Sequence, residues 1–294
     1  MYRYFIYGLG IWSEIKLYQL EQYTGAAQDV TVRRGGLPPD IVRYAEEGMK
    51  SSLSPDRAWF CNELGHFLIR NGQEIVLQPA EHATQEQLAS FVLGWCIAFL
   101  FQQRGSSAIH CSALERDNRA ILVSGGSGAG KSTLTLALLK KGFRYLADDI
   151  AMVDATQDML IQPAFPQQKV CRDVAESMES EQLFYVDEKK DKFAYMNRED
   201  FCGEPRKLST IFLLSKYEGD ELVIERLKGL DKWNGIMRNL FLLDAYLALG
   251  FPAEERNRCL AIAGRTEVYA IRRPEGKDTV EEICNRMLEL LLRD

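Results

Sequence analysis

The sequence predicts an α/β protein with a small β-rich domain at its amino-terminal end. Three observations support this fold class. Residues 1–82 contain short apolar runs separated by turns, whereas residues 83–294 alternate apolar strands with helices. Strands that alternate with helices are typical of a sheet covered by helices. The chain has 294 residues, which suits one large or two modest domains. We therefore predict two domains, at residues 1–82 and 83–294.

Short strands are expected throughout the first domain. They are predicted at residues 2–7, 30–32, 59–61, 67–70 and 74–77. Asn71 and Gly72 predict a two-residue hairpin turn between the last two, because both residue types accept a positive φ angle. His66 and His82 have no partner at metal or triad spacing, so we interpret both as structural.

The second domain is expected to begin with a buried helix. Residues 88–101 are nearly all apolar, but a bilayer span needs about 20 residues, so the stretch predicts a core helix that ends at Gly105. Further strands are predicted at residues 108–114, 120–124, 144–147, 150–153, 210–214 and 222–225. Further helices are predicted at residues 131–141, 233–249 and 279–292.

Composition argues against several classes of protein. The net charge is -6, and cationic runs such as residues 188–192 are mixed in sign, so we expect no nucleic-acid partner. The seven cysteines are scattered and never form C-x-x-C, which argues against a zinc site or a disulfide framework. Residues 1–4 do not begin a secretion signal, so we expect a cytoplasmic protein without a membrane partner.

A glycine-rich loop carries the clearest chemistry. Residues 125–132 read Gly-Gly-Ser-Gly-Ala-Gly-Lys-Ser, which satisfies G-x-x-x-x-G-K-[ST], between a predicted strand and a predicted helix. We expect this loop to bind ATP with Mg²⁺, because its amides and the helix start face an anion. Lys131 would reach the phosphates and Ser132 would ligate the metal. The predicted nucleotide-binding residues are Gly125, Gly126, Ser127, Gly128, Ala129, Gly130, Lys131, Ser132 and Thr133.

Two adjacent carboxylates, Asp148 and Asp149, follow the next predicted strand. The helix from Lys131 runs roughly 16 Å away from the phosphates, and the strand returns about 16–20 Å. The acids are therefore expected level with the loop, at the sheet edge where open α/β folds bind ligands. One acid would help to hold Mg²⁺ and the other would accept a proton from an attacking hydroxyl. Asp149 and Ser132 are the candidate metal ligands, although the pattern leaves the division between the two acids open.

His110 becomes a candidate through strand register. If residues 108–114 and 120–124 form a hairpin that turns near residues 116–118, position 110 pairs near position 124. A histidine there could contact the phosphate or orient Asp148. The alternative interpretation is a structural histidine.

Together, His110, the glycine-rich loop and residues 141–149 (Lys-Gly-Phe-Arg-Tyr-Leu-Ala-Asp-Asp) resemble the catalytic domain of HPr kinase/phosphorylase, a bacterial protein-serine kinase. The resemblance covers residues 107–154. It implies an HPr-kinase-type P-loop core that uses ATP and Mg²⁺, with acid–base catalysis within the Asp148–Asp149 pair, assisted by His110 and Lys131. Thr133 stands where that family usually has glutamate, Phe143 where it has histidine, and no later leucine-glutamate-isoleucine-arginine-glycine stretch follows. HPr as acceptor and the reverse, phosphorolytic reaction are therefore not implied.

Over its full length the chain looks more like the HPr-kinase-like proteins of lasso-peptide biosynthesis. The shared stretches are Tyr-Gly-Leu-Gly at residues 7–10, Gln-Arg-Gly at 103–105 and Gln-Pro-Ala-Phe-Pro at 162–166. The resemblance implies that the acceptor is the C-terminal serine of a precursor peptide.

Several readings of the function stay open. We expect a kinase for a serine hydroxyl in a peptide or protein partner, and a homo-oligomer is compatible with it. The alternatives are a small-molecule kinase and a nonenzymatic ATP-binding switch, because the loop specifies the phosphate donor but not the acceptor. Cations that could line the acceptor side are Lys169, Arg172, Lys192, Arg206 and Arg265.

Overall fold

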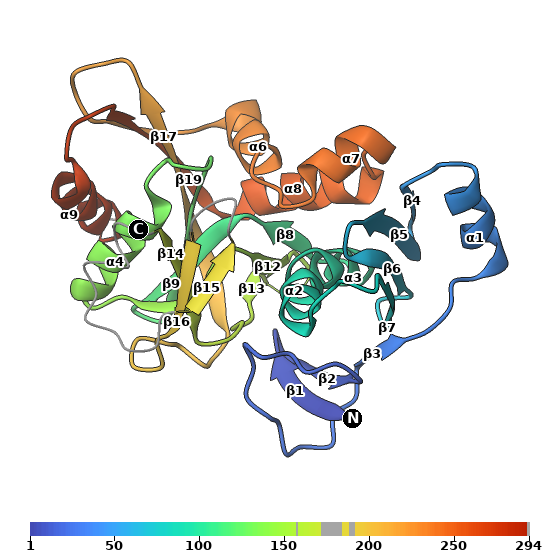
Figure 1. Ribbon diagram of the computed structural model, residues 1–294. Coiled ribbons are helices and arrows are strands. Elements are labelled where there is room, and N and C mark those ends of the chain that lie inside the picture. Colours follow the sequence, from blue (N-terminus) through green and yellow to red (C-terminus); the bar gives the residue numbers. More distant parts are fainter. Residues whose placement is uncertain (157, 172–183, 188–191, 293–294) are drawn as a thin grey trace.

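The computed structural model describes residues 1–156, 158–171, 184–187 and 192–292. They form three sheets with helices around them, which confirms the predicted α/β class. Figure 1 shows the strands of residues 2–79 on one side of the molecule and the larger sheet on the other. Within the described ranges, no helix is long and apolar enough to cross a bilayer.

The first sheet has the strand order β1-β2-β3-β7-β6-β5-β4. Its elements are β1 (Tyr2–Ile6), β2 (Leu9–Ser13), β3 (Val30–Arg34), α1 (Pro39–Glu46), β4 (Ser51–Ser54), β5 (Arg57–Asn62), β6 (Gly65–Arg70) and β7 (Glu74–Pro79). The five predicted strands are present, whereas β2, β4 and α1 were not predicted.

The turn between β6 and β7 corrects one detail. Asn71 and Gly72 have φ angles of 56° and 61°, as predicted, but the loop has three residues because Arg70 pairs with Glu74. The third residue, Gln73, has a tertiary partner, since its carbonyl accepts a hydrogen bond from Thr31 N in β3 at 2.8 Å.

A long helix connects the two sheets. It consists of α2 (Gln85–Phe91), the π-helical segment η1 (Val92–Cys96) and α3 (Ile97–Gln103). The predicted buried helix is therefore confirmed, and the chain leaves it at Gly105, which has φ 85°. One apolar cluster joins the first sheet, this helix and one face of the second sheet. Both predicted domains contribute to that core, and the boundary at residue 82 stays a prediction.

The second sheet has the order β11-β9-β10-β17-β13-β12-β8, with β19 beside β17 and β18 beside β19. Its strands are β8 (Ser107–Ile109), β9 (Cys111–Arg116), β10 (Arg119–Gly125), β11 (Arg144–Ala147), β12 (Ala151–Asp154), β13 (Leu160–Ile161), β17 (Arg206–Tyr217), β18 (Val223–Arg226) and β19 (Glu267–Pro274). A third sheet contains β14 (Gln167–Cys171), β16 (Lys192–Met196) and β15 (Phe184–Asp187).

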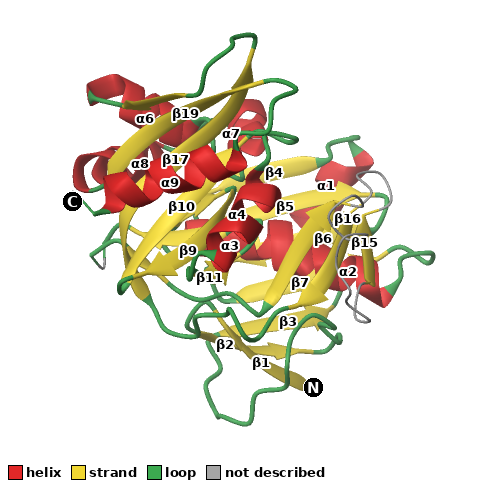
Figure 2. Ribbon diagram, turned by 90° about the vertical axis from the view of Figure 1, so that its left-hand side faces the viewer, coloured by secondary structure: helices red, strands yellow, loops and turns green. Residues whose placement is uncertain are grey.

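Helices cover both faces of the second sheet (Figure 2). They are α4 (Lys131–Lys140), α6 (Gly229–Met237), α7 (Leu243–Leu249), α8 (Ala253–Arg265) and α9 (Val280–Leu291). Along β10, Ile121 and Val123 pack with α4 and α9, whereas Leu122 faces the cluster that includes α6 and α8. This alternation is the period of two expected of a strand buried on both faces.

Two predicted elements are interrupted for the same reason. The predicted strand 108–114 breaks at His110, so that β8 pairs with β12 and β9 pairs with β10 and β11. The predicted helix 233–249 splits into α6 and α7, because Leu240 forms a bridge with Ile109 and Phe241 N donates to Ala108 O at 2.9 Å. Pairing across the sheet thus overrides the local patterns. Strand β19 and helix α8 were not predicted.

Candidate functional site

The glycine-rich loop leaves β10 at Gly125 and enters α4 at Lys131. Gly125 has φ 148°, and a Cβ there would lie 2.1 Å from Leu214 O, so a larger residue would clash with β17. Gly130, with φ 105°, precedes the helix, and no described side chain caps the amides of its first turn. The start of α4 therefore offers N–H groups to an anion, which fits a nucleotide phosphate.

Lys131 folds back over this loop. Its Nζ donates to Gly125 O at 2.7 Å and to Gly126 O at 3.2 Å, so the positive charge lies against the first two residues of the loop. Among the described residues, no group of three or more His, Cys, Asp or Glu side chains gathers as a metal site. Mg²⁺ bound with a nucleotide usually needs only one or two carboxylates besides phosphates and water, so Ser132 and Asp149 stay the predicted ligands.

Strand directions bring the acid pair to the edge of the sheet where the loop lies. Strands β10 and β11 are both antiparallel to β9, so they run parallel to each other. Their carboxyl ends, Gly125 and Ala147, therefore reach the same edge. Ser112 of β9 pairs with Val123 of β10, and its Oγ donates to Asp148 Oδ1 at 2.9 Å. The structure thus places the acids where the sequence argument expected them, while their chemical roles stay predictions.

The electrostatics of a buried thiol agree with this arrangement. Burial raises the pKa of Cys111, and the charges of Asp148, Lys131 and Asp149 act on the same thiol.

Asp148 is held at both oxygens. Ser112 occupies one, and Lys169 N donates to Oδ2 at 2.7 Å. Burial raises the pKa of Asp148, and the negative charge of Asp149 adds to the effect, whereas these hydrogen bonds oppose it. A carboxylate whose pKa is raised is a stronger base at neutral pH.

Asp149 occupies a backbone conformation that is uncommon for residues other than glycine. Its φ is 74°, in the left-handed region where non-glycine residues cost energy and which recurs at functional sites. Lys169 Nζ binds its Oδ2 at 2.8 Å. His110 Nδ1 lies 2.9 Å from its carbonyl oxygen and 3.5 Å from Oδ1. Since a carbonyl oxygen can only accept, His110 Nδ1 carries the proton in this contact.

His110 lies where the strand register predicted. Ser124 pairs with Cys111, and Ser124 Oγ donates to His110 O at 2.6 Å. His110 contacts Asp149, whereas the sequence suggested that it could contact the phosphate or orient Asp148. The strand breaks at His110, whose N donates to Asn239 O at 2.9 Å.

Of the five cations considered for the acceptor side, Lys169 alone reaches the acid pair among those whose side chains the structure describes. Arg206 pairs with Glu204 at 2.8 Å near the opposite end of the sheet, and Arg265 donates to Ala155 O at 3.2 Å. The side chains of Arg172 and Lys192 lie outside the described residues.

Sequence reasoning missed Asn239 and Arg273. Asn239 Oδ1 accepts from Ser124 Oγ at 2.9 Å, across 115 residues of sequence. Arg273, near the end of β19, donates from Nε to Ala129 O at 2.8 Å. The Arg-Arg pair after the apolar run of β19 was the available signal, because β19 lies parallel to β17 and ends at the edge where the loop lies.

Arg273→Gln should weaken ATP binding about 3–10-fold, because a loop without this charge-assisted hydrogen bond is less well preorganised. Titration of a fluorescent ATP analogue measures the effect. Arg272→Gln is the matched control, since Arg272 pairs with Glu225 at 3.2 Å and, within the described part of the chain, makes no hydrogen bond or ion pair with the loop. Equal affinities in the two variants would contradict a role for Arg273 in the loop.

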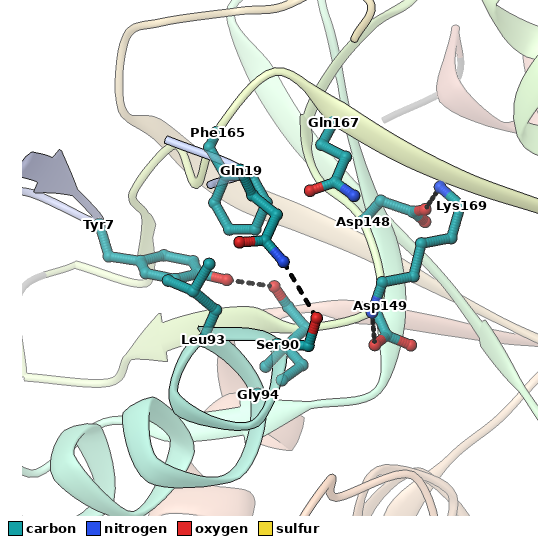
Figure 3. A pocket seen from close by; sticks show the side chains of 11 residues that line it. Tyr7, Gln19, Ser90, Leu93, Gly94, Asp148, Asp149, Phe165, Gln167 and Lys169 are labelled. Atoms are coloured by element: carbon teal, nitrogen blue, oxygen red, sulfur yellow. Dashed lines mark hydrogen bonds and ion pairs between the residues drawn. The ribbon is translucent and has the colours of Figure 1, made fainter. Parts of the chain in front are cut away.

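A pocket opens beside the acid pair (Figure 3). It encloses about 460 Å³ of empty space, including its opening to solvent. Its walls come from three parts of the chain: Tyr7 and Gln19 near the amino terminus, the helix around Gly94, and the sheet with Asp148, Asp149 and their neighbours. Tyr7 OH donates to Ile150 O at 3.1 Å, which fixes the amino-terminal wall against the sheet.

No protein-family model matches the chain, and no curated protein matches it. A search of solved structures finds the HPr(Ser) kinase/phosphatase from Coxiella burnetii, which is 14% identical over 63% of this chain and 91% of that chain, with a TM-score of 0.33. At that score the likeness is too distant to support an argument about this chain.

Proposed function

We propose that the chain is an ATP- and Mg²⁺-dependent phosphotransferase that acts on a serine hydroxyl of a peptide or protein. One observation carries the proposal: the parallel strands β10 and β11 end at the same sheet edge, one at the phosphate-type loop and the other at a hydrogen-bonded acid pair. An anion cradle beside a basic carboxylate is what phosphoryl transfer to a hydroxyl requires.

Each residue then has a definite task. Asp148 accepts the proton of the acceptor hydroxyl, since its raised pKa suits a general base. Lys131 and the amides at the start of α4 stabilise negative charge, and Ser132 with Asp149 would hold the metal. His110 and Lys169 keep Asp149 in its strained conformation. When bound, ATP with Mg²⁺ supplies the phosphoryl group and partly neutralises its charge.

The finer identity of the acceptor rests on the sequence resemblance. The stretches shared with lasso-peptide precursor kinases favour a C-terminal serine. A small hydroxylated molecule is the second candidate, because the loop specifies the phosphate donor but not the acceptor.

The proposal is tested by incubating the purified protein with ATP and Mg²⁺ in the presence of three acceptor sets. They are peptides that end in serine, the same peptides ending in alanine, and small alcohols. We expect ADP formation and a phosphorylated product for the serine-ending peptides, and neither product when EDTA is added. Transfer to small alcohols alone would move the assignment to a metabolite kinase. ATP binding without turnover on any acceptor would contradict the enzyme assignment and leave the nonenzymatic switch.

A further inference from the structure

Two buried amide side chains in the pocket beside the acids have unmet hydrogen-bonding capacity. Gln19 and Gln167 are 9% and 4% exposed, and both line the pocket that contains Asp148 and Asp149 (Figure 3). Among the described residues, Gln19 Oε1 and Gln167 Nε2 have no hydrogen-bond partner. A buried polar atom without a partner is costly, so two in one pocket point to a group that binds there.

The two unpartnered atoms are of opposite kinds. Gln19 Oε1 is an acceptor and needs an N–H or O–H donor, whereas Gln167 Nε2 is a donor and needs an acceptor such as a carbonyl oxygen. An amide group, with one N–H and one C=O, supplies both. A hydroxyl can also donate to one atom and accept from the other, so the choice of an amide follows from the proposed peptide acceptor, which presents amides beside its hydroxyl.

The surroundings hold the Gln19 side chain in place and position Gln167 beside the acid pair. Gln19 Nε2 donates to Ser90 Oγ at 3.0 Å, so that the helix fixes one end of its amide. Its segment is also tied to the first sheet, because Leu17 N donates to Tyr4 OH at 2.9 Å. Gln167 lies two residues before Lys169, which contacts both acids. The amide-binding atoms are therefore built into the walls around the acid pair.

The π-helical segment η1 contributes to the same wall. Leu93 and Gly94 belong to it, and both line the pocket. Gly94 adds no side chain, and a Cβ there would meet no described atom within 4 Å, so the wall is open at that point. Single π-helical turns inside helices recur at functional sites.

We propose that Gln19 and Gln167 bind an amide group of the phosphoryl acceptor and thereby hold its hydroxyl beside the acid pair. This inference rests on the proposed function, and it names two specificity residues, one of them in the amino-terminal domain. An acceptor that presents a hydroxyl next to an amide is then preferred over a simple alcohol. The amino-terminal segment is part of the active site under this proposal.

The test uses the full-length protein and two probes. N-acetylserinamide carries a transferable hydroxyl next to its amides, and N-acetylalaninamide has the same amides without the hydroxyl. Gln19→Met and Gln167→Met remove the amide atoms while nearly preserving side-chain length. Gln102→Met is the matched control, because Gln102 is also buried, at 7% exposed, with an unpartnered Oε1, yet it does not line this pocket.

We expect each pocket variant to raise the KM for N-acetylserinamide about 10-fold, since each removes one hydrogen bond from a buried site. The affinity for ATP should stay unchanged, and Gln102→Met should behave as the unsubstituted protein does. Binding of N-acetylalaninamide, followed by saturation-transfer NMR, should weaken in the same two variants. This second readout needs no turnover, so it separates failure of this inference from failure of the kinase assignment.

Unchanged KM and unchanged N-acetylalaninamide binding in a pocket variant that folds would overturn the inference. A long-lived water between the two amides that N-acetylalaninamide does not displace would also overturn it, because the amides would then only bind solvent. Thermal melting identifies a variant that fails to fold. Because Gln19 and Gln167 lie on separate segments, either variant that folds decides the question.

Discussion

Asp148→Asn should slow phosphoryl transfer by about 10²–10⁴ while ATP binding stays nearly unchanged, because the substitution removes a general base and leaves the loop intact. The pH–rate profile of this variant should also lose its acid limb, the range in which the rate rises with pH. Burial and the charge of Asp149 raise the pKa of Asp148 above 3.8, and only the ionised carboxylate accepts a proton. In the unsubstituted protein the rate should therefore rise with pH through this raised pKa. Single-turnover transfer across a pH series measures both effects.

Two variants control this prediction. Ser112→Ala removes the hydroxyl hydrogen bond that lowers the pKa of Asp148, so it should move the acid limb to higher pH with a smaller loss of rate. Asp149→Asn tests the partner acid, whose proposed task is to bind the metal. Normal transfer by both Asp148→Asn and Asp149→Asn would reject the assignment of catalysis to this pair.

Loss of folding cannot explain the expected result, since Asp148→Asn should stabilise the fold. The folded-state pKa of Asp148 is raised, so its contribution to stability is fully present below the unfolded pKa and is lost as pH rises through the folded pKa. At neutral pH the ionised carboxylate is therefore a cost, which asparagine removes while retaining a hydrogen-bond acceptor for Lys169 N. A gain of about 0.5–2 kcal/mol is expected for relief of such functional strain, measured by denaturant unfolding in metal-free buffer.

Local sequence was enough to predict the parts of the site that lie close together in the chain. The loop is contiguous, and the acid pair follows it after one helix and one strand, so standard helix and strand rises locate Asp148. His110 was found by register, because a short hairpin fixes which residues pair.

The remaining site residues depend on contacts that no local pattern encodes. Tyr7 reaches Ile150 across 143 residues, and Arg273 reaches Ala129 across 144. The same limit explains the break at His110 and the end of α6, since both follow from the pairing of Ile109 with Leu240. Burial patterns identify which strands lie in the core, but not which strand edge a distant loop will meet.

Lys131→Met should lower phosphoryl transfer by about 10²–10³, the usual cost of removing one group that stabilises charge in a transition state. Lys131 Nζ already lies over the loop, bonded to Gly125 O at 2.7 Å, so its charge is fixed where phosphates would bind. Lys131→Arg should recover little of the rate, because a planar guanidinium cannot replace a compact ammonium at a turn this tight. Single-turnover transfer measures the loss of rate, and nucleotide titration measures the affinity for ATP separately.

Lys140→Met provides the matched control at the far end of the same helix, where the side chain is exposed. It removes the same charge from α4 without touching the loop, so normal transfer is expected. A loss of rate as large as that of Lys131→Met would mean that the charge of the helix, and not the position of Lys131 over the loop, supports the reaction. The cradle at the start of α4 would then be an anion site without a catalytic lysine, and the division of tasks between loop and acid pair would have to be revised.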